Sequence, residues 1–338
     1  MPEYDAVFYE AFQEEESVLR EVLPENRKYF FTWKTVQESN HKTPPSSIIS
    51  TRTQSIIPLD WAEKLSAIIT RSTGYDHITE YIEKASNKKI LTAYLPDYAA
   101  RAVAEQAMLL WTALLRDIRA QEEAFKTFNR DGLTGKELRG RKILIAGVGK
   151  IGGEIADIAH GLGMKIMGVD IKPNHQLGKK LDIDYVSFED GLSDAEIMVC
   201  ALPLTSSTRG MLNYQLLSRM PRGSIFINIA RGEISPAQDL VKLLKENILH
   251  GVGLDVYDHE RELAAVLRDE IPTASFSGAA KESLEAISEL MKHPHVIMTP
   301  HNAFNTAESV KRKSLRTAEN LRVFFDTGTF LTPIDRSI

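Results

Sequence analysis

The chain has one cysteine among its 338 residues, and this scarcity excludes several classes of protein. Cys200 can form neither a disulfide within the chain nor a cysteine-based metal site, and such a composition is typical of a reducing compartment. No apolar stretch approaches about 18 residues, so we expect no transmembrane helix. The acidic N-terminus has no apolar core, so we expect no signal peptide and, by default, a cytoplasmic protein.

The chain also lacks an excess of basic charge. Lys and Arg number 41 against 46 Asp and Glu, the net charge is −5, and no basic cluster stands out. This distribution argues against a nucleic-acid partner, and we expect neither a membrane partner nor a metal centre. What remains is an ordinary globular composition, 43% hydrophobic and 26% charged, in a chain long enough for about two domains.

In the first hundred residues, short apolar runs alternate with polar helical segments. Strands are predicted at residues 5–11, 29–36, 47–51, 65–70 and 90–95, and a helix at 14–23. Strands that alternate with helices predict a parallel sheet covered on both faces. A long helix rich in Ala and Leu follows at 99–118, and its apolar positions run almost all round, so we expect it to be buried.

From residue 142 the pattern becomes regular. Continuous apolar strands are predicted at residues 142–147, 165–170, 196–202, 224–230, 251–257 and 295–300. Strands of this kind are buried on both faces, and the segments between them are long enough for crossover helices, so they predict a doubly wound sheet. A last helix is predicted at 306–325, and we interpret the second sheet as an insertion into the first domain.

A glycine motif follows the first strand of the second sheet. Gly147, Gly149 and Gly152 form G-x-G-x-x-G, and Asp170 ends the next strand, 23 residues after Gly147. In such a motif the first glycine allows the tight turn, the second lets the backbone approach a pyrophosphate, and the third lets the helix pack closely. Asp170 can accept hydrogen bonds from ribose hydroxyls and would repel a 2′-phosphate, so NAD is predicted rather than NADP. The alternative interpretation is a glycine turn that binds nothing.

Three polar segments follow later strands of the same sheet, where ligands bind in open α/β sheets. They contain Arg231, the run from Asp255 to Glu260, and His301. An arginine can bind and polarise a 2-oxo acid, and a histidine can give a proton to its carbonyl oxygen as hydride arrives. A carboxylate beside the histidine would favour the protonated imidazole and orient it. Periodicity does not choose among Asp258, His259 and Glu260 for that role, and each residue alone has an ordinary surface alternative.

Five ordered motifs between residues 45 and 325 resemble the D-isomer-specific 2-hydroxyacid dehydrogenases. They are the glycine motif with Asp170, residues 200–205, residues 228–232, residues 253–260 and residues 299–301. The resemblance implies that Arg231, Glu260 and His301 are catalytic, and it selects Glu260 over Asp258. It also implies a discontinuous substrate domain at 1–99 and 303–338 and an NAD-binding Rossmann domain at 100–302. The active site is then expected in the cleft between them. The resemblance further implies a homodimer formed through the helix near 99–118.

The resemblance further implies the residues that bind the two ligands. Those expected to contact NAD are Gly147, Gly149, Lys150, Ile151, Gly152, Asp170, Leu202, Pro203, Thr208, Ala230, Asp255 and His301. Those expected to contact the substrate are Thr73, Gly74, Tyr98, Arg231 and Phe304.

Within the family the chain is most similar to the D-lactate dehydrogenase branch. The marks are residues 70–78, 96–98, 102–105 and 300–306, together with the spacing of 41 positions from Glu260 to His301. The resemblance implies reversible hydride transfer between NADH and a small 2-oxo acid, with pyruvate and D-lactate as the expected pair. Arg261 and Asn302 depart from common patterns, so glycerate, phosphoglycerate, glyoxylate, hydroxypyruvate or a branched 2-oxo acid remains an alternative, as does an NAD-sensing regulatory protein with this fold.

Overall fold

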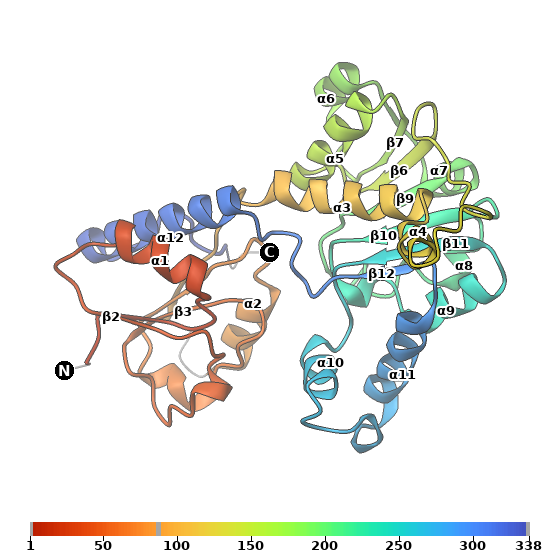
Figure 1. The fold of residues 1–338 in the computed structure, drawn as a ribbon. Helices are drawn as coiled ribbons and strands as arrows, with labels where there is room; N and C mark the ends of the chain where they lie inside the picture. Colours follow the sequence, from red (N-terminus) through yellow and green to blue (C-terminus); the bar gives the residue numbers. More distant parts are fainter. Residues whose placement is uncertain (1–2, 86–88, 336–338) are drawn as a thin grey trace. The chain divides into compact units, whose positions relative to one another are not determined.

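The computed structural model describes residues 3–85 and 89–335, and the chain forms two compact units. Unit 1 comprises residues 1–99 and 305–338, and unit 2 comprises residues 100–304. The first boundary, between residues 99 and 100, is the one expected from the sequence. The second lies between residues 304 and 305, two residues later than expected. Each unit is built on its own parallel sheet (Figure 1), which confirms the predicted α/β class with two doubly wound sheets.

The sheet of unit 1 has the strand order β2-β1-β3-β4-β5, and all neighbours are parallel. Its strands are β1 (Ala6–Phe8), β2 (Tyr29–Phe31), β3 (Ile48–Thr51), β4 (Ala67–Thr70) and β5 (Leu91–Ala93). This order is that of flavodoxin-like sheets. Each strand lies inside the predicted range but is shorter, because the flanking apolar residues belong to loops that pack against the sheet.

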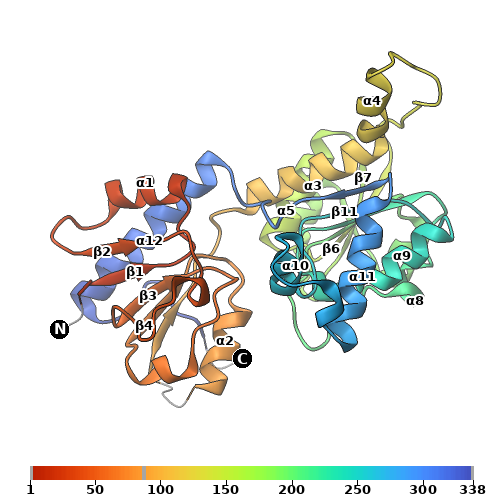
Figure 2. The same cartoon turned by 60° about the horizontal axis from the view of Figure 1, so that its bottom comes forward.

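Helices cover both faces of this sheet. They are α1 (Gln13–Val22), α2 (Asp76–Lys84) and α12 (Ala307–Thr327). Val7 and Ile68 share a core cluster with Ile78 and Ile82 of α2, whereas Phe8 points to the opposite face, as alternation along a strand requires. On that opposite face α1 and α12 lie side by side (Figures 1 and 2). The returning C-terminal helix is therefore an integral layer of unit 1.

The sheet of unit 2 has the order β12-β11-β10-β9-β6-β7-β8, again entirely parallel. Its strands are β6 (Lys142–Ala146), β7 (Lys165–Val169), β8 (Ile183–Tyr185), β9 (Ile197–Cys200), β10 (Ser224–Asn228), β11 (Leu249–Leu254) and β12 (Val296–Met298). From β8 to β11 this is the dinucleotide-binding strand order, and its direction reverses between β6 and β9. The sequence prediction missed β8, because only Ile183 of its three residues is buried and an edge strand has no continuous apolar run.

The helices of unit 2 also form two layers. They are α3 (Ala100–Leu115), α4 (Ile118–Phe125), α5 (Lys150–Gly161), α6 (His175–Leu181), α7 (Phe188–Asp194), α8 (Tyr214–Leu217), α9 (Ala237–Lys245), α10 (Glu260–Leu267) and α11 (Gly278–Lys292). The long helix predicted at 99–118 is wrong at its end, because Asp117 adopts a left-handed conformation with φ of 48° and separates α3 from α4. Within residues 3–85 and 89–335 we find no helix long and apolar enough to cross a membrane.

Candidate active site

The glycine motif forms the turn between β6 and α5. Gly147 has φ of +88°, and a Cβ there would lie 2.7 Å from the carbonyl oxygen of Ala201. A Cβ on Gly152 would lie 1.9 Å from the carbonyl oxygen of Gly147, so the helix packs directly on the turn. These two positions need glycine for internal reasons, one for its backbone conformation and one for close packing.

Gly149 is different, because nothing inside the protein requires glycine there. A Cβ on Gly149 would meet no heavy atom of the described residues within 4 Å, and its φ is negative. Gly149 precedes the first residue of α5, where backbone N–H groups and the positive end of the helix dipole face outward. An open approach to a helix N-terminus suits a pyrophosphate, so the residues present fit the dinucleotide that the motif predicts.

Asp170 lies directly after β7, beside the glycine turn. One of its carboxylate oxygens accepts a hydrogen bond from Val148 N at 2.8 Å, and the other accepts one from Lys172 N at 2.8 Å. These bonds hold the carboxylate at the carboxyl edge of the sheet, and each oxygen keeps a further acceptor site for a ribose hydroxyl. The next residue, Ile171, is 96% exposed, and no sequence pattern singles it out.

The other residues expected at the cofactor follow neighbouring strands. Lys150 and Ile151 begin α5, Leu202 and Pro203 follow β9, and Ala230 follows β10. Thr208 closes the loop after β9, because its hydroxyl donates to Pro203 O at 2.7 Å and accepts from Thr205 N at 2.8 Å. All of these positions lie beyond the carboxyl ends of strands around the point where the strand order reverses.

His301 and Glu260 meet across this edge of unit 2. His301 Nδ1 lies 2.9 Å from Glu260 Oε2, and both side chains are about three-quarters buried. Since an ionised carboxylate only accepts, Nδ1 carries the hydrogen, and Nε2 is left for a ligand. Glu260 Oε1 also accepts from Tyr257 N at 3.1 Å, which fixes the carboxylate. Of the acidic residues left open by periodicity, Glu260 therefore carries the contact with His301.

Hydrogen bonds to Asp255 hold the loop that bears His301. This carboxylate is 1% exposed and accepts hydrogen bonds from Thr299 Oγ1 (2.5 Å), Asn302 N (2.9 Å) and Ala303 N (2.8 Å). Burial raises the pKa of Asp255, and the hydrogen bonds from Thr299 and the loop backbone oppose that rise. These contacts indicate that Asp255 positions the loop that carries His301, whose φ is +50°. The expected contact of Asp255 with the cofactor stays a prediction.

Arg231 lies on a turn that follows β10. The buried Asn228 holds this turn, because its Nδ2 donates to Arg231 O and Ser235 Oγ while its Oδ1 accepts from Ala230 N. A Cβ on Gly232 would lie 1.9 Å from the carbonyl carbon of Tyr257. The turn of Arg231 therefore packs directly against the backbone that leads to Glu260.

The remaining residues expected at the substrate are divided between the units. Thr73 and Gly74 lie in the loop after β4, where Thr73 Oγ1 donates to Leu95 O at 3.2 Å and Ser72 Oγ donates to Gly74 O at 2.7 Å. The Tyr98 carbonyl accepts from Arg312 Nε of α12 at 2.8 Å. Phe304 is a buried residue at the end of unit 2. Their expected contacts with a substrate stay predictions.

Sequence reasoning missed the residues that support these side chains. Asn228, Thr299 and the Tyr257 hydroxyl, which donates to Thr299 O at 2.8 Å, act on loops rather than on ligands. Their only sequence signal is a polar side chain at or just past the end of an apolar strand. That signal does not tell whether the side chain points to a ligand or to a neighbouring loop.

The comparisons with known proteins agree with this geometry. The family model described as "D-isomer specific 2-hydroxyacid dehydrogenase, NAD binding domain" matches residues 108–303. A D-lactate dehydrogenase of Curvularia clavata is 30% identical over 269 residues, which cover 77% of this chain and 72% of that protein. A glyoxylate reductase of Pyrococcus furiosus is 31% identical over 242 residues, which cover 68% and 71% respectively.

Solved structures share the fold of the whole chain. The D-lactate dehydrogenase of Aquifex aeolicus, complexed with NAD and lactic acid, matches with a TM-score of 0.80 and 24% identity over 98% of this chain and 100% of that one. D-2-hydroxyisocaproate dehydrogenase gives a TM-score of 0.80 at 22% identity, over 97% and 99%.

Fold, glycine turn and family model together define an NAD-binding oxidoreductase. The chain belongs to the D-isomer specific 2-hydroxyacid dehydrogenase family, and its cofactor is NAD.

Proposed function

We propose that the chain interconverts pyruvate and D-lactate with NADH and NAD, and that Arg231, Glu260 and His301 carry the reaction. The observation that carries the proposal is the 2.9 Å hydrogen bond between His301 Nδ1 and Glu260 Oε2 at the carboxyl edge of the dinucleotide-type sheet. It provides an acid and base at the same edge of the sheet as the predicted cofactor turn.

His301 moves the proton in this proposal. Because Nδ1 is engaged by Glu260, Nε2 is the nitrogen that donates a proton to the carbonyl oxygen of the 2-oxo acid. In the opposite direction the neutral imidazole accepts the hydroxyl proton through the same nitrogen. Glu260 stabilises the charged imidazole and keeps the ring in one orientation.

Arg231 binds and polarises the substrate. Its guanidinium donates to Ala230 O through Nη1 at 2.8 Å, and its forked donors match the geometry of a carboxylate. Its positive charge also favours the negative charge that develops on the carbonyl oxygen. The turn on which it lies is held rigid by Asn228 and by the contact of Gly232 with the chain that leads to Glu260. NADH, when bound, supplies the hydride for reduction of the carbonyl carbon.

Pyruvate is favoured by two observations. The chain resembles the D-lactate dehydrogenase branch in the segments already described, and a D-lactate dehydrogenase is among its relatives at 30% identity. Glyoxylate is the second candidate, because the glyoxylate reductases of Pyrococcus furiosus and Thermococcus kodakarensis are 31% and 32% identical. Both substrates use the same carboxylate and carbonyl contacts and differ only in one methyl group.

A panel of 2-oxo acids tests the choice. Initial rates of NADH oxidation are measured with pyruvate, glyoxylate, hydroxypyruvate and a branched 2-oxo acid, and the product of pyruvate is resolved by chirality. The proposal predicts the highest kcat/KM with pyruvate and formation of D-lactate. A higher kcat/KM with glyoxylate would make glyoxylate the preferred substrate, and the proposed roles of the three residues would not change.

The proposal also includes a homodimer and a cytoplasmic location. The dimer is expected to use the segment around α3, and the exposed apolar side chains of Leu109, Ile118, Phe125 and Phe128 support it. The location rests on the composition alone.

A further inference from the structure

Three polar side chains converge at the amino ends of two strands of unit 2. Asp117 lies between α3 and α4, His250 lies near the start of β11, and His295 directly precedes β12. Asp117 Oδ1 is 2.9 Å from His295 Nδ1 and 3.5 Å from His250 Nε2, and one ligand-type atom of each residue lies within 4.8 Å of the others. One carboxylate oxygen thus faces two imidazole nitrogens.

This cluster lies apart from the candidate active site. Arg231, Glu260 and His301 follow the carboxyl ends of β10, β11 and β12, whereas His250 and His295 lie at the opposite ends of β11 and β12. The five residue steps from His250 to Asp255 span roughly 16 Å of extended strand. The cluster therefore requires an explanation of its own.

The distances also suit a shared metal ion. At 3.5 Å, His250 Nε2 is too far from Asp117 Oδ1 for a good hydrogen bond. Two ligand atoms on one tetrahedral Zn²⁺ ion, each about 2.0–2.1 Å from the metal, lie roughly 3.3 Å apart. The two observed separations, 2.9 and 3.5 Å, lie on either side of that value.

The backbone of Asp117 also directs its side chain to the histidines. Asp117 is the residue before α4, where an aspartate ordinarily accepts a hydrogen bond from the helix N-terminus, yet its side chain makes no such cap. It adopts a left-handed conformation with φ of 48°, which few non-glycine residues do. The carboxylate instead makes its hydrogen bond with His295.

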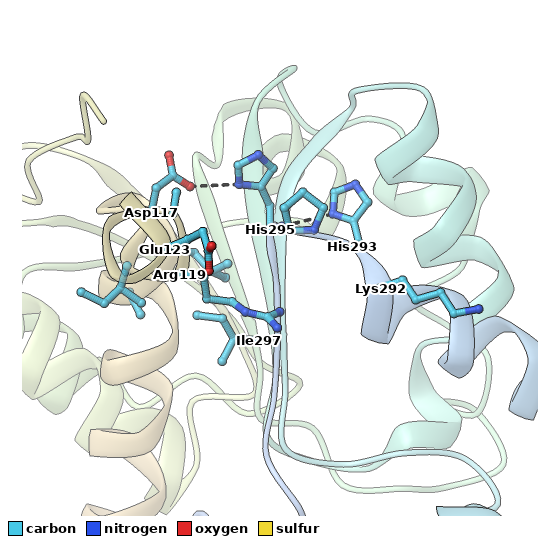
Figure 3. Close-up of a pocket in the computed structure, with 12 residues that line it drawn as sticks. Asp117, Arg119, Glu123, Lys292, His293, His295 and Ile297 are labelled. Carbon is cyan, nitrogen blue, oxygen red and sulfur yellow. Dashed lines mark hydrogen bonds and ion pairs between the residues drawn. The ribbon is translucent and has the colours of Figure 1, made fainter. Parts of the chain in front are cut away.

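The cluster is accessible from solvent. Asp117 and His295 line a half-open hollow of about 330 Å³, and Figure 3 shows the two side chains pointing toward each other at that hollow, with His293 beside His295. The side chains of Asp117, His250 and His295 are 21%, 33% and 34% exposed. Charges of both signs line the hollow, because Glu123 accompanies Arg119 and Lys292. An ion can therefore reach the ligand atoms.

We propose that Asp117, His250 and His295 bind one divalent transition-metal ion of the Zn²⁺ type. Imidazole and carboxylate ligands suit zinc, and three protein ligands leave one position of a tetrahedral ion for water. His250 would coordinate through Nε2 and His295 through Nδ1. The ion joins the α3–α4 corner to β11 and β12, so its binding stabilises unit 2.

Calorimetric titration of the tag-free, EDTA-treated full chain with ZnCl₂ tests the proposal. The expected result is one ion per chain, and Asp117→Asn and His250→Ala should each weaken binding by at least ~10–100-fold, the loss usual for residues that only orient metal ligands. His160→Ala, which removes an exposed histidine at the end of α5, is the matched control and should bind as the unmodified chain does. Circular dichroism in EDTA establishes that each variant is folded.

Two further measurements distinguish specific binding at this site from non-specific metal binding. Co²⁺ should give the strong visible absorption of a tetrahedral complex, and Zn²⁺ should raise the Tm of the unmodified chain but not that of Asp117→Asn. Mg²⁺ should do neither, because it prefers octahedral oxygen ligands. The proposal is wrong if no stoichiometric Zn²⁺ binding is found, or if the folded Asp117→Asn and His250→Ala variants bind Zn²⁺ as tightly as the unmodified chain. The cluster would then be a hydrogen-bonded contact alone.

Discussion

Glu260 holds the His301 imidazole with one carboxylate oxygen and is itself held by Tyr257 N through the other. Reduction of a 2-oxo acid requires the protonated imidazole, and oxidation of the alcohol requires the neutral one. In the proposed reaction, the negative charge of Glu260 stabilises the protonated imidazole relative to the neutral one.

Glu260→Gln keeps the shape of the side chain and removes its charge. We expect the upper pH limit of the reduction rate to move to lower pH, and part of kcat to survive. His301→Ala removes the proton donor and should lower kcat by about 10²–10⁴-fold. Rate profiles against pH in both directions check this, and if Glu260→Gln left both profiles in place, the charge of Glu260 would have no part in the protonation of His301.

Arg231→Lys preserves the charge at the end of β10 but loses the paired donors of the guanidinium. We expect a higher KM for the 2-oxo acid together with a lower kcat, while NADH binding measured by fluorescence titration stays nearly unchanged. A near-normal kcat/KM would show that another cation binds the carboxylate. Arg71 is a poor substitute, because Glu15, Ser50 Oγ and Tyr9 O accept its hydrogen bonds in the interior of unit 1, so Arg52 would be tested next.

Asp170 is expected to set the choice of cofactor. Its carboxylate, held by Val148 N and Lys172 N, would repel the 2′-phosphate of NADPH. The unmodified chain should use NADH with a far higher kcat/KM than NADPH, and Asp170→Ala should narrow that ratio. Equal kcat/KM for the two cofactors in the unmodified chain would contradict this role.

Among the structural elements, the turn after β10 packs directly against the segment that follows β11. Gly232→Ala would force a Cβ to within 1.9 Å of the Tyr257 backbone. We expect a loss of stability of about 1–3 kcal/mol or more, and a fall in kcat as the Arg231 turn moves. Gly161→Ala is the matched control, since a Cβ at that helical position meets no described atom within 4 Å, and its Tm and kcat should stay the same or rise slightly. Thermal denaturation and initial rates measure both variants.

A buried ion cluster joins α1, β4 and α12 in unit 1. Glu15 lies 2.8 Å from Arg71 Nε and 3.0 Å from Lys313 Nζ, and all three side chains are at most 1% exposed. Burial alone would raise the pKa of Glu15, but the charges of Arg71, Lys313 and Arg52 lower it to about 2. The stability that Glu15 contributes is therefore complete above its ordinary pKa of 4.5 and is lost as the pH falls through about 2.

Glu15→Gln leaves the buried guanidinium of Arg71 without its counter-charge, and it removes the carboxylate that favours the charged form of Lys313, whose pKa burial lowers to about 7. We therefore expect unit 1 to lose about 3–5 kcal/mol at neutral pH. The difference in Tm from the unmodified chain should shrink as the pH falls from 4.5 toward 2. Glu16→Gln, which affects only a partly exposed helical pair with Arg20, should change Tm little at any pH. Calorimetry across this pH range checks both, and a difference that does not depend on pH would contradict the ionised state of Glu15.

The elements show where sequence reasoning succeeds and where it stops. The strands of unit 2 from β6 to β12 were predicted except β8, because strands buried on both faces are continuous apolar runs. The break at Asp117 was not predicted, since the chain passes from α3 to α4 through Arg116 and Asp117 without a Gly or Pro. The cluster of Asp117, His250 and His295 has no metal-ligand spacing in the sequence, and only the pairing of β11 with β12 and the corner after α3 bring it together.

For the whole molecule, the insertion of one doubly wound unit into another was predicted, because the regular strands of unit 2 are followed by one long terminal helix that belongs to unit 1. The catalytic candidates were predicted because each lies in a segment that follows a strand of the second sheet, and the choice of Glu260 among the acidic residues came from the resemblance to the family. The supporting residues Asn228, Asp255 and Thr299 were not recognised in that role, because a pattern of residue types does not show where a side chain points.

The most direct test of the central claim is the reduction of pyruvate by NADH with the unmodified chain and with His301→Ala. The account predicts that the unmodified chain consumes NADH and forms an equal amount of D-lactate, and that His301→Ala, still folded and still able to bind NADH, loses this activity by about 10²–10⁴-fold. The absence of turnover with pyruvate and with every other 2-oxo acid, or a His301→Ala variant with unchanged kcat, would contradict it.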